Sequence, residues 1–255
     1  MLRRIAERLG RKRVLKRRLP SEFGGTPLYI SPDAQLKYLR FGRGAFDADL
    51  LRMASEEIEP NSTIWDIGAN VGVFAFAAAS RALPGGHVLA VEPDEWLANI
   101  IRRSAALPEN SRLAVQVLAA AISDKVGTRT LLIAERGRAS NALQGVGRNQ
   151  MGGVRDRVAV QTFTLDHLLD SYPMPHLVKI DVEGAEYQVL QGASRMLSDV
   201  RPKIYVEVGS DLSDSVTARL REHDYVLLDP MSPKSRRTRI VKCAFNTLAI
   251  PQESL

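Results

Sequence analysis

The chain has 255 residues and 45% hydrophobic content, which suffices for the core of one large domain. Its single cysteine, Cys243, excludes an internal disulfide framework and a metal cluster built on cysteines. The net charge is +6, but residues 1–19 contain nine Lys or Arg and one acid, so the remainder carries −2 and is not a basic nucleic-acid-binding body.

Neither a secretory signal nor a membrane span is expected. Arginines interrupt the N-terminus before an apolar signal segment can form. The longest apolar run, residues 71–79, is shorter than the roughly 20 residues that a spanning helix needs. We therefore expect a cytoplasmic protein.

Residues 1–19 are predicted to form a basic N-terminal tail. Leu2, Ile5 and Leu9 recur at helical spacing among arginines, a pattern found in helices that lie on anionic membrane surfaces. Gly10 would weaken such a helix by roughly 1 kcal/mol. We interpret the segment as a solvated tail, with weak contact to a membrane surface as the alternative.

Residues 20–60 are expected to form a small N-terminal cap beside the ligand cleft. Glycines and prolines indicate a loop, which is followed by a short strand at residues 28–30 and an amphipathic helix at residues 47–59. Three side chains of this cap are candidates for lining the cleft or packing in the core: Tyr38, Arg40 and Phe46.

Strands and helices alternate from residue 61 to residue 255. Apolar runs predict seven strands, at residues 63–66, 87–91, 113–118, 177–181, 203–208, 225–228 and 244–250. Helical spacing predicts helices at residues 73–82, 94–106, 185–197 and 212–222. Two further runs, residues 128–134 and 158–163, predict an antiparallel hairpin inserted over about residues 127–163. The fold class is therefore α/β, with a mostly parallel seven-stranded sheet and helices on both faces.

The first of these strands leads into a glycine turn with the pattern D-x-G-x-x-x-G, formed by Asp66, Gly68 and Gly72. Strand, glycine turn and helix in this order make the first half of a nucleotide-binding unit. A carboxylate at the strand tip would repel a pyrophosphate, which such turns bind at the helix N-terminus. Asp66 suits instead a ligand with an amine and no phosphate, as in S-adenosylmethionine.

Glu92 ends the second strand, 20 residues after Gly72. Doubly wound folds place an acid at this distance to accept the ribose hydroxyls of a nucleotide. This residue alone does not separate a nicotinamide cofactor from S-adenosylmethionine. Asp66 and the missing third glycine favour S-adenosylmethionine.

The fourth strand ends in the sequence K-I-D-V-E-G-A-E, residues 179–186. Strand alternation places Lys179, Asp181 and Glu183 on one side. Asp181 lies at the carboxyl end of the strand, beside the point where ligands bind in such sheets. A carboxylate there can hold the cofactor's amine, orient an acceptor, take its proton or bind a metal.

Four motifs together resemble the FkbM family of S-adenosylmethionine-dependent methyltransferases. They are D-I-G-A-N-V-G at 66–72, V-E-P at 91–93, V-K-I-D-V-E-G-A-E at 178–186 and I-Y-V-E-V at 204–208. The resemblance covers roughly residues 36–250 and implies a Rossmann-like class I methyltransferase fold. It implies that the cofactor is bound by Asp66, Gly68, Asn70, Gly72 and Glu92.

The resemblance also implies that residues 121–124, including Ser123, lie by the adenine. In the inserted hairpin the family often has paired serines before a leucine. This chain reads Ser140-Asn141-Ala142-Leu143 at that place.

We expect O-methylation of a hydroxyl on a small molecule or sugar. Asp181 is the candidate nearest the transferred methyl group, and Lys179 and Glu207 are further catalytic candidates. A divalent metal would find oxygen ligands in Asp181, Glu183 and Glu207, although no spacing fixes a site. Two segments rich in Lys and Arg, residues 135–156 and 230–242, are expected to be substrate-contacting or solvated loops.

Three alternatives remain open from the sequence. They are an NAD-dependent oxidoreductase of similar fold, an RNA ribose methyltransferase, and a binding protein that has kept the fold without catalysis. The chain has neither an Asn/Asp-Pro-Pro-aromatic motif nor a Pro-Cys pair, so DNA bases are not the expected acceptor. Nucleic acid is therefore not the favoured partner.

Overall fold

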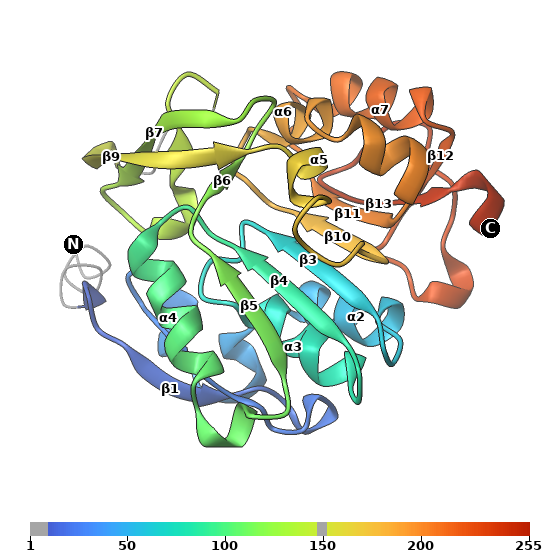
Figure 1. The fold of residues 1–255 in the computed structure, drawn as a ribbon. Coiled ribbons are helices and arrows are strands. Elements are labelled where there is room, and N and C mark those ends of the chain that lie inside the picture. Colours follow the sequence, from blue (N-terminus) through green and yellow to red (C-terminus); the bar gives the residue numbers. More distant parts are fainter. Residues whose placement is uncertain (1–9, 147–151) are drawn as a thin grey trace.

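A seven-stranded, mostly parallel sheet forms the centre of the molecule (Figure 1). The computed structural model describes residues 10–146 and 152–255. The strand order is β12-β13-β11-β10-β3-β4-β5, and β13 runs antiparallel to both of its neighbours. The strands are β3 (Thr63–Ile67), β4 (His87–Val91), β5 (Ala114–Leu118), β10 (Leu177–Ile180), β11 (Lys203–Glu207), β12 (Tyr225–Leu228) and β13 (Asn246–Pro251). The predicted sheet is confirmed.

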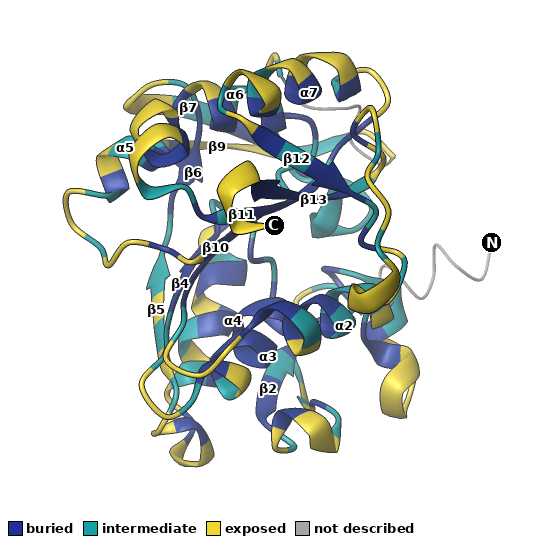
Figure 2. Cartoon of the chain, turned by 90° about the vertical axis from the view of Figure 1, so that its right-hand side faces the viewer, coloured by how far each residue is buried: buried dark blue, intermediate teal, exposed yellow. Residues whose placement is uncertain are grey.

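Helices cover both faces of this sheet, so that its strands lie buried between two layers (Figure 2). One face carries α2 (Ala48–Glu57), α3 (Val73–Ala82) and α4 (Glu95–Ala105). The other carries α5 (Leu165–Leu168), α6 (Glu186–Gln191) and α7 (Ser213–Glu222). Burial on both faces explains why the central strands are nearly continuous apolar runs. No helix in these described ranges is long and apolar enough to cross a membrane.

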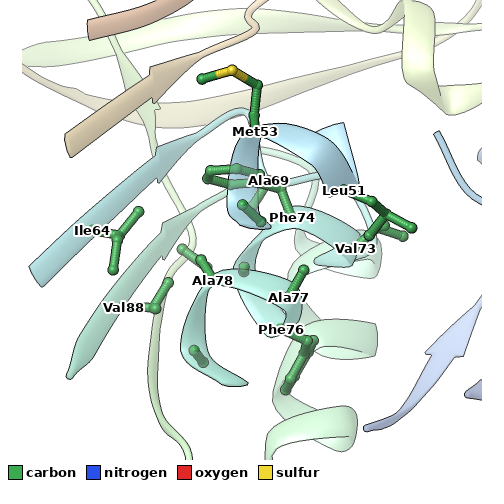
Figure 3. Close-up of a cluster of buried hydrophobic side chains, with 14 of the residues drawn as sticks. Leu51, Met53, Ile64, Ala69, Val73, Phe74, Phe76, Ala77, Ala78 and Val88 are labelled. Atoms are coloured by element: carbon green, nitrogen blue, oxygen red, sulfur yellow. The ribbon is translucent and has the colours of Figure 1, made fainter. Parts of the chain in front are cut away.

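Helix α3 is buried almost all round, because it lies between the sheet and α2. Its alanines allow close packing, and Figure 3 shows Ala78 facing Ile64 and Val88 on the sheet. Phe74 of α3 and Met53 of α2 belong to the same core. This packing fixes the start of α3, and with it the turn that follows β3.

The predicted helix at residues 185–197 is wrong in its length. Helix α6 ends at Gln191, and a π-helix, Met196–Val200, follows it. The chain leaves α6 at its C-cap, Gly192, where an added Cβ would lie 2.4 Å from the Ser123 carbonyl oxygen. The backbone at residue 192 lies so close to the Ser123 carbonyl that only glycine fits there.

The inserted segment forms a second, four-stranded sheet of order β6-β9-β7-β8. Its long strands β7 (Gly127–Ala134) and β9 (Val154–Phe163) are the predicted antiparallel pair. The two-residue strands β6 (Ala121–Ile122) and β8 (Ala142–Leu143) are too short to leave a periodic signal in the sequence.

The N-terminal region differs from the predicted solvated tail. Strand β1 (Leu15–Arg18) pairs antiparallel with β2 (Pro27–Ile30), and the backbone N–H of Tyr29 in β2 donates to Ser104 Oγ of α4 at 2.8 Å. The high density of Lys and Arg in β1 hides its strand pattern in the sequence. The predicted helical spacing of residues 2–9 lies outside the described residues.

Candidate active site

An open cavity lies at the carboxyl ends of β3, β4, β10 and β11, and about 920 Å³ within it, including its mouth, is not filled by atoms. From β3 the sheet grows in one direction through β4 and β5 and in the other through β10 and β11. The strand order therefore reverses at β3, and α/β sheets bind ligands at such a point. The N-terminal cap and the inserted segment supply the remaining walls.

The turn after β3 requires glycine for two separate reasons. Gly68 has a φ of +80°, and an added Cβ would lie 1.8 Å from the Asp181 carbonyl oxygen. Gly72 has a φ of +84° and starts α3, where a Cβ would meet the ring of Phe76 at 3.2 Å. Gly68 lines the cavity, whereas Gly72 is not among the lining residues. Both glycines therefore allow close packing of protein against protein.

Glu92 and Asn70 form the polar wall of the cavity at the end of β4. Glu92 accepts hydrogen bonds from the backbone N–H groups of Asn70, at 2.7 Å, and Asp94, at 2.9 Å. Burial raises the pKa of Glu92 to about 8, despite these two donors. The Asn70 side-chain oxygen is buried with no hydrogen-bond partner. It is therefore an acceptor that a ligand can satisfy.

Asp66 does not face the cavity, contrary to the expectation that it contacts the cofactor's amine. It is fully buried, and its Oδ1 lies 3.1 Å from Lys179 Nζ. The same ammonium lies 3.4 Å from Asp181 Oδ2. Burial opposes the charge on Lys179, but Asp66 and Asp181 outweigh it and raise the pKa of the lysine. Asp66 and Lys179 thus form a buried pair behind the site, and only Asp181 reaches the cavity.

Glu207 lines the cavity beside Asp181, at the end of the neighbouring strand β11. Burial raises the pKa of Glu207 to about 7, and the negative charge of Asp181 adds to this rise. A carboxyl with a pKa near neutrality can take a proton at physiological pH. Glu207 is therefore a cavity-lining carboxyl that changes its charge near neutral pH.

The N-terminal cap contributes a different set of side chains from the predicted one. Tyr38 and Phe46 are buried in the core and Arg40 is exposed. The cavity is lined instead by Gln35, Leu50 and the ion pair between Lys37 Nζ and Asp47 Oδ2, at 3.3 Å. Asp47 also caps α2, because its side chain accepts from the backbone N–H groups of the first turn.

Arg138 ties the inserted segment to the rim of the cavity. Its guanidinium pairs with Asp94 and, at 3.0 Å, with Asp33 Oδ2, and it lies 4.7 Å from the centre of the Trp96 ring. The side-chain amide of Asn141, also in the inserted segment, donates to Asp94 Oδ2 at 2.8 Å. This network joins the cap, the insert and the start of α4 above Glu92.

The two basic loops make ion pairs with other parts of the fold, and the first also lines the cavity with Arg138, Ala139 and Asn141. In the first, Arg155 pairs with Asp33 at 3.2 Å, as Arg138 does. In the second, Arg237 pairs with Glu57 and Glu56 of α2, and no residue of the described segment 230–242 lines the cavity. The arginines of these loops hold the walls in place.

The segment predicted to lie by the adenine is only partly at the cavity. Ala121 and Ile122 line it, together with Ala120. Ser123 is buried, and its hydroxyl donates to Asp124 Oδ1 at 3.0 Å, away from the lining. In the ranges 10–146 and 152–255, no group of three or more His, Cys, Asp or Glu side chains is arranged to hold a metal ion.

Comparison with known proteins identifies the family. A family model described as the methyltransferase FkbM domain matches residues 66–227, well over half of the chain. The chain belongs to the FkbM methyltransferase family. This membership decides against the NAD-dependent alternative and implies S-adenosylmethionine as the methyl donor.

Individual relatives of this FkbM methyltransferase are distant. The hexuronic acid methyltransferase AglP of Haloferax volcanii is 24% identical, over 71% of this chain and 76% of that protein. The FkbM methyltransferase structure of Methylobacillus flagellatus is 16% identical with a TM-score of 0.45, covering 86% of this chain and 58% of that one. An S-adenosylmethionine-dependent O-methyltransferase of Thermotoga maritima is 11% identical with a TM-score of 0.46, covering 81% and 65%.

The residues of the cavity fit S-adenosylmethionine. Glu92 presents a carboxylate at the tip of β4, and Asn70 presents a buried oxygen that lacks a partner. Ala120, Ala121 and Ile122 provide an apolar wall beside them, which suits a flat base. The polar and apolar parts of an adenosine group thus both have a counterpart in the FkbM methyltransferase.

Proposed function

We propose that this FkbM methyltransferase methylates a hydroxyl oxygen of a sugar or another small molecule. The observation that carries the proposal is the pair Glu207 and Asp181, which line the cavity at the ends of adjacent strands. When S-adenosylmethionine is bound, it supplies an electrophilic methyl group on a positively charged sulfur. A hydroxyl acceptor must lose its proton as it takes that methyl group, so a base has to stand beside it.

The residues around the end of β4 hold the cofactor in this proposal. Glu92 accepts hydrogen bonds from the ribose hydroxyls. The side-chain oxygen of Asn70, which has no hydrogen-bond partner among the described residues, accepts a further hydrogen bond from the cofactor. Gly68 lets β3 and β10 end side by side, which brings Asp181 next to that pocket. Gly72, Asp66 and Ser123 support the site from behind without lining it.

Glu207 takes the acceptor's proton, and Asp181 orients the acceptor close to the methyl group. The Lys179 ammonium pairs with both Asp66 and Asp181, and its positive charge compensates part of the negative charge of Asp181. Glu207 has no such ion pair among the described residues, and its pKa of about 7 matches a general base. Unchanged turnover in Asp181→Asn would contradict the role of Asp181.

A sugar acceptor is supported by the relative named as a hexuronic acid methyltransferase. Besides Glu92, four carboxylates line the cavity, Asp47, Asp181, Glu183 and Glu207. The two basic side chains that line it, Lys37 and Arg138, are each already paired with an acid. Negative charge of this kind repels an anionic group. A neutral hydroxyl is therefore the better acceptor here than a carboxylate or a phosphate.

The test is transfer of a labelled methyl group from S-adenosylmethionine to a panel of acceptors. The panel contains neutral sugars, hexuronic acids, small-molecule alcohols and an RNA oligonucleotide, each with and without a chelator. We expect label in an ether of a neutral sugar or alcohol. Label only in RNA would favour the ribose methyltransferase alternative, and cofactor binding without transfer to any acceptor would favour a non-catalytic binding protein.

Comparing transfer with and without the chelator decides whether a divalent metal is needed. The cytoplasmic location stays a prediction.

A further inference from the structure

A short exposed loop with an apolar tip joins the two halves of the N-terminal cap. Residues 39–44, with the sequence L-R-F-G-R-G, are all exposed. The Phe41 side chain is 87% exposed and Leu39 is 46% exposed. Gly42 has a φ of +62°, with no other group within 4 Å of the place where a Cβ would be. These two apolar side chains therefore stand in solvent, where they add little to the core.

The N-terminal part of the described chain, which includes this loop, is rich in positive charge. Residues 10–46 contain nine Lys or Arg and two acids, although the whole chain has a net charge of only +6. The Arg17 guanidinium of β1 lies 5.6 Å from the centre of the Phe41 ring. We call the group formed by Arg17, Leu39, Arg40, Phe41 and Arg43 the docking edge.

The docking edge is continuous with the mouth of the active-site cavity. Lys37 precedes the loop and Asp47 follows it, and both line the cavity. Their ion pair, at 3.3 Å, closes the base of the loop. Anything that binds the loop therefore sits directly at the entrance for the acceptor.

We propose that the docking edge binds the surface of an anionic lipid bilayer. An exposed phenylalanine and leucine can enter the boundary between headgroups and acyl chains. The neighbouring arginines keep their guanidinium groups at the level of the lipid phosphates, because long basic side chains extend along apolar surface. Arg43 is the one member of the edge with an ion pair to a described acid, Glu22, so most of the charge is uncompensated within the described residues.

Lipid explains the loop better than single-stranded nucleic acid does. Proteins that bind single strands use a basic groove with several aromatic side chains on which successive bases stack. Here one ring, Phe41, stands beside an aliphatic side chain, Leu39, which offers no stacking surface. The docking edge is separate from residues 1–9, which lie outside the described part of the chain.

The experiment measures co-sedimentation of the full chain with vesicles. One set is made of phosphatidylcholine alone and the other of phosphatidylcholine mixed with phosphatidylglycerol. We expect binding to the anionic vesicles only, weakened by added salt because ions screen the arginines. Phe41→Ser should reduce the coefficient for partition from water to the anionic vesicles about tenfold, because the variant has no phenylalanine ring to transfer from water into the bilayer.

Met174→Ser is the matched control, because Met174 is 63% exposed and precedes β10 at the end of the sheet away from the cavity. This variant should bind vesicles as the unchanged chain does. Equal binding by Phe41→Ser and Met174→Ser would overturn the proposal, as would binding lost only when residues 1–9 are deleted. Preferential binding to a single-stranded RNA oligonucleotide, lost in Phe41→Ser, would also overturn it. Circular dichroism of each variant shows that it is folded.

Discussion

Replacing Gly68 with alanine tests how closely β3 and β10 meet at the active site. The added Cβ would lie 1.8 Å from the Asp181 carbonyl oxygen, whereas real Cβ atoms essentially never come closer than 3.0 Å to such an atom. The left-handed backbone at φ +80° adds strain of about 1–2 kcal/mol for alanine. Moving the end of β10 aside costs about 1–3 kcal/mol more, as overpacking does elsewhere. Gly68→Ala should therefore lower the free energy of unfolding by about 2–5 kcal/mol.

Gly145→Ala separates the two contributions. Gly145 has a φ of +85° and open space around the place of a Cβ, so alanine there meets the backbone strain alone. Urea denaturation followed by circular dichroism should show a loss of about 1–2 kcal/mol for this control. Equal losses in Gly68→Ala and Gly145→Ala would refute the close approach. Calorimetry should also show weaker S-adenosylmethionine binding in Gly68→Ala alone, because Asp181 moves with β10.

Three further predictions concern charged groups of the site. Glu207→Gln should lower kcat about 10²–10⁴-fold. In the unchanged enzyme kcat should rise with pH through about 7, because Glu207 ionises there. A similar pH profile of kcat in the variant would exclude Glu207 as the base. S-adenosylmethionine should bind more tightly as pH rises through about 8, because ionised Glu92 accepts hydrogen bonds from the ribose hydroxyls better. The same group makes the free enzyme less stable as pH rises from about 4.5 to about 8, since burial raises the folded pKa of Glu92 from 4.5 to about 8. Calorimetry should find the binding independent of pH in Glu92→Gln. Lys179→Met should cost about 3–5 kcal/mol of stability by leaving Asp66 buried without a partner, and adding Asp66→Asn should restore part of it in urea denaturation.

Much of the architecture was predictable because the central strands are buried on both faces. The run that became β4 is apolar nearly throughout, and so are the three central residues of β11, so their positions are visible in the sequence. Carboxyl ends of parallel strands share one edge of a sheet, which is why Glu92, Asp181 and Glu207 were expected near one another. The structure places all three in one cavity.

Contacts between non-adjacent segments were not predictable in the same way. Lys179 stands directly opposite Asp66 in the pairing of β10 with β3, and this pairing depends on the strand order. A charged residue at the tip of an unplaced strand looks like a ligand contact, so Asp66 was assigned to the cofactor. Likewise Arg138 meets Asp33 across 105 positions of sequence, and no local pattern records that contact.

The ion pairs beneath α2 have a consequence for engineering the acceptor preference. Glu57 of α2 is fully buried and pairs with Arg237 of the C-terminal loop and, at 2.7 Å, with Lys203 of β11. Grafting the cap of a relative onto this chain would leave Arg237 and Lys203 facing a foreign helix. A chimera meant to accept a new sugar therefore has to take residues 20–60, residues 230–242 and the residue at position 203 together from one parent.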